Sequence, residues 1–123
     1  MPDSTQKTRV LIVDDERVIA DTLVLILNKN GFEAKAVYSS REAVQAAESF
    51  HPEKIISDVI LADGSGIDAA IQICALLPNC KVILFSGQAA TADLLEKARA
   101  QGHTFQILAK PVAPPDLLAH LRA

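Results

Sequence analysis

Short hydrophobic runs alternate with longer amphipathic segments along this chain of 123 residues. Each run is rich in branched aliphatic residues and has the length of a β-strand, and each following segment repeats its apolar residues at helical spacing. Such alternation is typical of β-α units on a parallel sheet. The predicted strands are Arg9 to Asp14, Glu33 to Tyr38, Lys54 to Ile60, Cys80 to Ser86 and Thr104 to Ala109.

Helices are predicted between the strands and after the last one. They run from about Glu16 to Lys29, from Ser39 or Ser40 to Phe50, from Ile67 to Leu77, from Ala92 to Arg99 and from Asp116 to Ala123. Gly31 suits the left-handed position that ends the first helix. Asp63 or Ser65 is expected to cap the third helix. The predicted core stripe of the first helix is Val18, Ile19, Thr22, Leu23, Ile26 and Leu27.

The pattern predicts one α/β domain of three layers, in which helices cover both faces of a parallel sheet. Nearly continuous apolar strands are expected when both faces are buried. A chain of 123 residues is long enough for one core and short for two. We expect a polar tail over residues 1–8 and a single domain over 9–123, because no linker rich in Pro, Gly or Ser divides the chain.

Composition narrows the range of partners and compartments. The net charge is -3, so no basic field favours direct binding to nucleic acid or to an anionic membrane. The apolar runs are far shorter than the roughly 20 residues of a membrane-spanning helix. The polar start lacks the apolar stretch of a signal peptide, which predicts a cytoplasmic protein. Cys74 and Cys80 are expected to be reduced thiols packed as small hydrophobes.

Polar residues follow four of the predicted strands, at the edge of a parallel sheet where ligands bind. They are Asp14, Asp15, Asp58, Ser86 and Lys110. Three acids this close would raise each other's pKa values unless a cation joined them, and Mg²⁺ suits a small oxygen site. Lys110 and Ser86 could then contact phosphoryl oxygens. An aspartate that attacks phosphorus forms an aspartyl phosphate, a known covalent intermediate.

Four motifs in this order, "VLIVDDE", "IISDVILADGSGID", "VILFSG" and "ILAKP", make the chain resemble the receiver domains of two-component response regulators. The resemblance covers essentially the whole chain. It implies a flavodoxin-like (βα)5 fold with strand order 2-1-3-4-5. It also implies a signalling domain rather than an enzyme, which takes a phosphoryl group from a histidine kinase or phosphotransfer protein and then changes its affinity for a downstream effector or output domain.

The resemblance assigns a role to each residue of the cluster. Asp58 would be the phosphoacceptor, Ser86 the switch hydroxyl and Lys110 the group that pairs with the phosphate. Asp14, Asp15, Asp58 and the backbone carbonyl of Ile60 would hold Mg²⁺. The bond between Lys110 and Pro111 would be cis, which an X-Pro bond permits at a cost of roughly 0.5–1 kcal/mol.

Three positions depart from the family pattern. Ala62 stands where the family often has proline, so we expect a less stiff loop after the third strand. Ile107 stands where many members have the aromatic residue of the switch, and Phe105 lies two residues earlier on the same expected side. The last helix lacks the dense charge pattern of members that dimerise through their fourth and fifth helices.

Other interpretations remain open at this stage. Each polar residue alone is compatible with an ordinary turn or helix cap. A Mg²⁺-dependent phosphatase with an aspartate nucleophile is the alternative function, although "DDER" has no second aspartate at the spacing that such enzymes use. A flavin-binding module is disfavoured by four Phe, one Tyr and no Trp. His51, His103 and His120 are expected to be surface residues.

Overall fold

The computed structural model describes residues 7–86, 96, 98–100, 102, 105–110 and 112–122. Their centre is a sheet of five parallel strands in the order β2-β1-β3-β6-β7. The strands are β1 (Thr8–Val13), β2 (Phe32–Val37), β3 (Lys54–Asp58), β6 (Lys81–Ser86) and β7 (Gln106–Ala109). This order equals the predicted 2-1-3-4-5, so the predicted fold class is confirmed.

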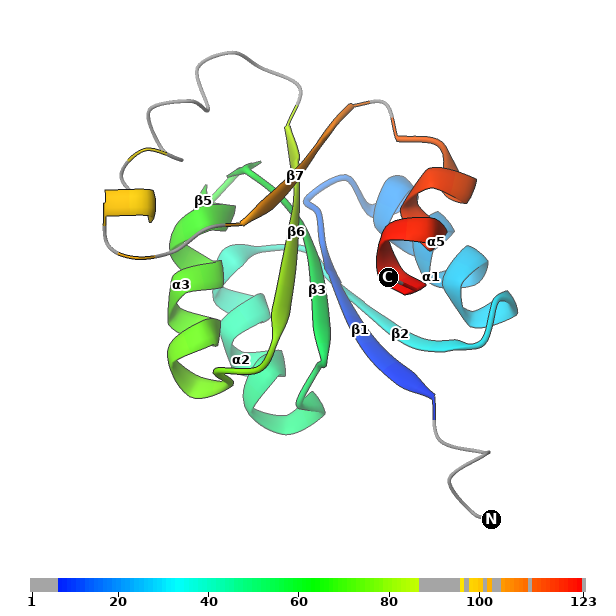
Figure 1. The fold of residues 1–123 in the computed structure, drawn as a ribbon, viewed down its shortest axis with the longest axis horizontal. Coiled ribbons are helices and arrows are strands. Elements are labelled where there is room, and N and C mark those ends of the chain that lie inside the picture. Colours follow the sequence, from blue (N-terminus) through cyan, green and yellow to red (C-terminus); the bar gives the residue numbers. More distant parts are fainter. Residues whose placement is uncertain are drawn as a thin grey trace.

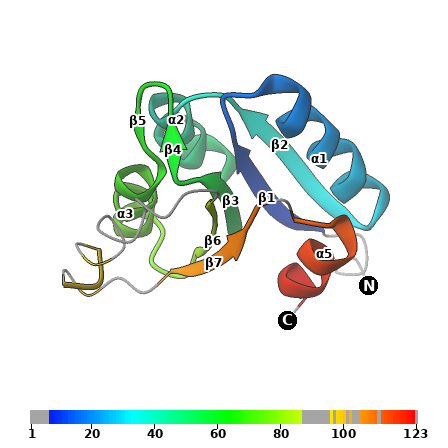
Figure 2. The same ribbon diagram turned by 90° about the horizontal axis from the view of Figure 1, so that it is seen from above.

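Helices cover both faces of the sheet (Figures 1 and 2). On one face lie α1 (Arg17–Lys29) and α5 (Pro114–Arg122), and on the other lie α2 (Ser40–Phe50) and α3 (Gly66–Leu76). Residues 98–100 are helical and overlap the end of the predicted fourth helix, most of which lies outside the described residues. No helix of the described part of the chain has the length and apolar character needed to cross a membrane.

The core forms because the central strands bury both of their faces. Val10, Leu11, Ile12 and Val13 of β1 are all at most 2% exposed. Alternate residues join different clusters: Val10 and Ile12 pack toward α1 and α5, whereas Leu11 and Val13 pack toward α2 and α3. Strands of this kind read as continuous apolar runs because each side chain meets a helix.

The predicted core stripe of α1 was wrong in part. Ala20 and Leu27 are buried, and Leu23 and Val24 pack against them. Val18 is 79% exposed and Ile19 is 37% exposed, although both belonged to the predicted stripe. This helix carries apolar residues around much of its circumference, so spacing alone could not select the buried face.

The third predicted strand was too long. It ends at Asp58, and the segment after it forms a separate antiparallel hairpin of β4 (Ile60–Leu61) and β5 (Gly64–Ser65). Figure 2 shows the hairpin beside α2, above the end of β3. The sequence predicted only a turn at these positions. The hairpin brings the backbone of residues 60–65 next to the strand ends.

Helix ends confirm some predictions and correct others. Ser39 caps α2 by accepting the N–H of Glu42, and Ser65 caps α3 by accepting the N–H of Ile67. Gly31 has a φ of 92°, as the predicted left-handed position requires. The last helix begins at Pro114, two residues before the predicted start, since proline fits the first turn of a helix.

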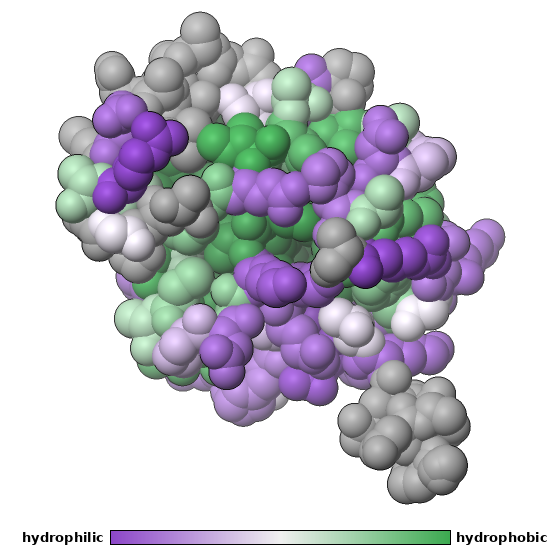
Figure 3. All heavy atoms as spheres, in the orientation of Figure 1, coloured by the Kyte–Doolittle hydropathy of each residue, from purple (hydrophilic) through white to green (hydrophobic). Residues whose placement is uncertain are grey.

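The edge strand β7 leaves apolar surface exposed. Ile107 is 38% exposed, and Leu108 is only partly buried. Hydrophobic atoms lie around β6 and β7 in the space-filling view, interrupted by bands of hydrophilic atoms (Figure 3). Phe105 instead packs against the cluster of Val82 and Leu84, so it does not share the exposure of Ile107.

Candidate functional site

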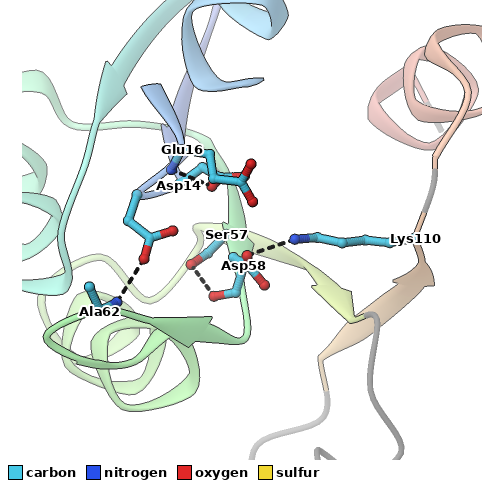
Figure 4. A network of polar contacts seen from close by, with 7 residues as sticks. Asp14, Glu16, Ser57, Asp58, Ala62 and Lys110 are labelled. Carbon is cyan, nitrogen blue, oxygen red and sulfur yellow. Dashed lines mark hydrogen bonds and ion pairs between the residues drawn. The ribbon is translucent and has the colours of Figure 1, made fainter. Parts of the chain in front are cut away.

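Three aspartates meet at the carboxyl ends of β1 and β3. Val13 pairs with Ser57 in the parallel ladder, so the residues that follow, Asp14 and Asp58, emerge side by side. Asp14, Asp15 and Asp58 each offer a carboxylate oxygen, and these oxygens lie within 4.8 Å of one another. The cluster that the strand ends predicted is therefore present in the fold (Figure 4).

Asp14 is the buried member of the cluster, at 2% exposure. Its N–H donates to the carbonyl of Val37, and its Oδ1 accepts the N–H of Glu16 at 2.9 Å. Burial raises the pKa of Asp14, and the charges of Asp58 and Asp15 raise it further against the lowering effect of the Glu16 N–H. A buried acid with two like charges beside it favours either a proton or a cation.

Lys110 reaches the same cluster from the end of β7. Its Nζ lies 2.7 Å from Oδ2 of Asp58, and Figure 4 shows its side chain extended across the site. Burial alone would lower the pKa of Lys110, but the hydrogen bond to Asp58 and the charges of Asp58 and Asp14 raise it overall. Lys110 is therefore held in its charged form beside Asp58.

Ser86 ends β6 next to this lysine. Ser86 pairs with Ala109 in the parallel ladder, and its carbonyl accepts the N–H of Lys110 at 3.0 Å. A residue at the end of a strand adjacent to β3 and β7 lies on the edge that carries Asp58 and Lys110. The fold thus brings all five predicted side-chain positions to one edge of the sheet.

The loop after Asp58 is held closely against the site. Oδ2 of Asp15 accepts the backbone N–H of Ala62 at 2.9 Å, and Ser57 Oγ donates to the carbonyl of Asp58 at 2.9 Å. The N–H of Gly66 donates to the carbonyl of Val59 at 2.7 Å. These hydrogen bonds hold the loop without a proline, and the expectation of a less stiff loop with Ala62 stays a prediction.

Gly66 permits the close approach of α3 to the end of β3. A Cβ on Gly66 would lie 1.9 Å from the carbonyl oxygen of Asp58 and 2.7 Å from Oγ of Ser57. Sequence reasoning missed this position, although the glycine at the start of a predicted helix is a signal for close backbone contact. It also missed the hydrogen bond from the Ala62 backbone amide to Asp15, because the residue type at a position does not show what its amide contacts.

Other sequence predictions concern residues around the site. Asp63 does not cap α3; its carboxylate accepts the N–H groups of Ser40 and Arg41 and so caps α2. Ile60 lies in β4, and its backbone carbonyl stays a predicted ligand. Pro111 and His103 lie outside the described residues, so the cis bond and the surface position of His103 stay predictions. His51 is exposed, and His120 contacts Gln106.

The two cysteines lie away from the carboxylate cluster. Cys74 and Cys80 are both free thiols, and Cys80 is buried. Burial raises the pKa of Cys80 to about 12, so the neighbouring Lys81 does not activate it. The prediction of reduced, packed thiols is confirmed for Cys80, which belongs to the cluster formed with Leu11 and Ile73.

The acid cluster fits a hard divalent cation. Lys110 contributes one positive charge against the three negative charges of Asp14, Asp15 and Asp58. All the ligand atoms that the cluster offers are carboxylate oxygens, which Mg²⁺ prefers over nitrogen or sulfur. Burial, and after it the charges of Asp58 and Asp15, raises the pKa of Asp14, so its charged form is disfavoured when no cation is bound.

The chain is similar to proteins of two-component signalling. Chemotaxis protein CheY of Thermotoga maritima is 34% identical over 107 residues, which cover 86% of this chain and 88% of that protein. The DNA-binding response regulator MtrA of Mycobacterium tuberculosis is 25% identical over 122 residues, but these are 51% of its length. The chain thus spans about half of that regulator.

A solved structure shares the fold. The receiver domain protein of Methanospirillum hungatei superposes with a TM-score of 0.85 at 26% identity, covering 95% of this chain and 92% of that one. A family model described as the response regulator receiver domain matches residues 10–122. With the fold, the strand-end residues and this match in agreement, the chain belongs to the response regulator receiver domains.

Proposed function

We propose that this receiver domain accepts a phosphoryl group on Asp58, with Mg²⁺ bound by Asp14, Asp15, Asp58 and the backbone carbonyl of Ile60. The observation that carries the proposal is the contact between Asp58 and Lys110 at 2.7 Å inside a cluster of three acids. A carboxylate at a sheet edge, next to a fixed cation and two further acids, has the surroundings that an aspartyl phosphate requires.

The donor would be a phosphohistidine of a sensor histidine kinase or of a phosphotransfer protein. A carboxylate oxygen of Asp58 attacks phosphorus, a P–O bond forms, and the P–N bond to the imidazole breaks as that ring takes a proton. Mg²⁺, when bound, neutralises charge on the transferring phosphoryl oxygens. Lys110 would hold the Asp58 carboxylate in place before transfer and pair with a phosphoryl oxygen after it.

Ser86 would carry the signal out of the site. It lies beside Lys110 in the sheet, and a hydroxyl there can donate to a phosphoryl oxygen on Asp58. Movement of Ser86 toward the phosphate would change the surface that a downstream effector or output domain contacts. In this proposal no aromatic residue is needed at position 107, where Ile107 is 38% exposed on the edge strand β7.

The test is phosphorylation followed by intact-mass measurement. The parent chain, incubated with acetyl phosphate or a phosphorylated histidine kinase and Mg²⁺, should gain one phosphoryl group. Asp58→Asn should gain none, and a chelator should stop the reaction in the parent. Labelling of Asp58→Asn to the level of the parent would disprove the acceptor assignment. Multiple turnover of a generic phosphate ester would instead favour the phosphatase alternative.

The switch role of Ser86 has a separate test. Ser86→Ala should still be labelled, because Ser86 is not the acceptor, but phosphorylation should no longer change the affinity for the downstream partner. An unchanged response of the partner to phosphorylation of Ser86→Ala would remove Ser86 from the mechanism.

A further inference from the structure

The backbone amide of Ala62 contacts one of the acids of the cluster. Ala62 lies in the turn between β4 and β5, and its N–H donates to Oδ2 of Asp15 at 2.9 Å. The hairpin ladder pairs Ile60 with Ser65 and Leu61 with Gly64, so the ladder does not use this N–H. The amide is therefore available as a dedicated donor to Asp15.

The hairpin that carries this amide is fixed at both ends. At the turn, Asp63 Oδ1 accepts the N–H of Ser40 at 2.9 Å, and its Oδ2 accepts the N–H of Arg41 at 3.2 Å. At the base, the N–H of Gly66 donates to the carbonyl of Val59 at 2.7 Å. A donor whose backbone is held in this way keeps its direction and does not need to be ordered when a ligand arrives.

Asp15 is the member of the cluster that needs such a partner. Its side chain is exposed, unlike the buried Asp14, so in isolation it would sample several rotamers. A hydrogen bond to one carboxylate oxygen selects a single orientation and leaves the second oxygen for a cation. In the structure, a carboxylate oxygen of Asp15 lies within 4.8 Å of carboxylate oxygens of Asp14 and Asp58.

We propose that the Ala62 backbone N–H is a positioning donor that orients the Asp15 carboxylate and thereby sets the affinity of this chain for a divalent cation. The inference rests on the proposed function for the cation site itself. It adds that a backbone group at residue 62 controls how tightly the cation binds.

Proline at position 62 removes this donor alone. Among the described non-glycine residues only His51 has a positive φ, so Ala62 lies on the side of φ that proline requires. Leu61 is in the strand β4, and an extended residue tolerates a following proline. Since the ladder does not use the N–H of residue 62, Ala62→Pro deletes the bond to Asp15 and keeps the hairpin pairing.

The experiment measures cation binding without phosphorylation. Mn²⁺, a spectroscopic stand-in for Mg²⁺ at oxygen sites, is titrated into the parent, Ala62→Pro and Ala62→Ser, and free Mn²⁺ is read by electron paramagnetic resonance. Ala62→Pro should bind Mn²⁺ about tenfold more weakly, the lower end of the effect of losing a group that orients a ligand. The control Ala62→Ser keeps the N–H and should bind Mn²⁺ as tightly as the parent.

The outcomes separate this inference from the proposed function. Equal affinities of the parent and Ala62→Pro would overturn the role of Ala62 and leave the cation site in place. An absence of Mn²⁺ and Mg²⁺ binding by the parent would overturn the cation site and this inference together.

A second measurement does not depend on the folding of the proline variant. Amide hydrogen exchange at Ala62 is followed by NMR in the metal-free parent and in Asp15→Ala. Exchange at Ala62 should be several-fold faster in Asp15→Ala, because the acceptor of that N–H is gone. Equal exchange rates at Ala62 would contradict the proposal.

Discussion

Gly66 shows how a hydrogen atom in place of a methyl group determines how closely α3 can approach the end of β3. Its Cα packs so closely on the backbone of Asp58 that a Cβ would overlap the carbonyl oxygen at 1.9 Å. By helix propensity alone, alanine is preferred over glycine, by about 1 kcal/mol in a helix interior and by less at the first helical residue, where Gly66 lies. The steric cost has the opposite sign, so the two effects can be told apart by experiment.

Gly66→Ala should destabilise the chain by about 1–3 kcal/mol, the usual cost of overpacking, and should weaken cation binding by displacing Asp58. Urea denaturation and Mn²⁺ titration measure the two effects. Gly31→Ala is the matched control: its φ of 92° makes alanine strained, but no atom lies within 4 Å of its Cβ position. That control should lose stability and keep the parent's Mn²⁺ affinity. A Gly66→Ala variant more stable than the parent would contradict the close contact.

At the scale of the element, the hairpin of β4 and β5 connects the site to helix α2. The carboxylate of Asp63 accepts two N–H groups at the start of α2, where unpaired amides and the helix dipole favour a negative charge. The hydrogen bonds from Ser40 and Arg41 lower the pKa of Asp63. A movement of the hairpin would therefore change the hydrogen bonds at the first turn of α2.

Asp63→Asn should be less stable than the parent at pH 7, since the amide keeps one acceptor oxygen but loses the charge. The lowered pKa of Asp63 means that its contribution is present above the unfolded pKa of about 3.9 and is lost as the pH falls through the folded pKa. Urea midpoints of both chains should therefore converge at acidic pH. Glu33→Gln, at an exposed acid of β2, is the control. A stability gap that persists unchanged at the lowest pH would argue against the charged cap.

At the scale of the whole molecule, the like charges of the acid cluster should oppose folding, and a bound cation would offset them. Asp14 is buried beside two further carboxylates, and Lys110 offsets part of their charge. Ligands that bind the folded chain alone stabilise it, by about 2.7 kcal/mol at a concentration 100 times the dissociation constant. Cation binding and folding stability should thus be linked in this domain.

Asp14→Asn should be more stable than the parent in the presence of a chelator, by about 1 kcal/mol, the order of one like-charge interaction at this separation in water. The reason is that the raised pKa of Asp14 marks its charge as unfavourable in the folded state at neutral pH. Added Mg²⁺ should stabilise the parent more than the variant and close the gap. Glu48→Gln, an exposed acid of α2 outside the cluster, should show neither effect when both are measured by thermal unfolding. A less stable Asp14→Asn under the chelator would refute the charge argument.

The order of apolar runs and polar residues by itself determined the α/β class, the positions of the five sheet strands and the candidates Asp14, Asp15, Asp58, Ser86 and Lys110. It could do so because parallel strands buried on both faces have a recognisable composition, and because their carboxyl ends share one edge. Those signals lie in short segments of the chain, so they can be recognised without knowing any tertiary contact.

Only the tertiary structure decided which backbone groups serve the site. The N–H of Ala62 meets Asp15 across 47 positions of the chain, and the Cα of Gly66 meets the carbonyl of Asp58 across the turn into α3. The buried face of α1 was likewise decided by the sheet against which the helix packs. Ala20 is buried in the cluster that includes Val10 and Ile12 of β1, whereas Val18 is 79% exposed. Amides look alike in every sequence, so their partners become visible only when the folded chain brings them together.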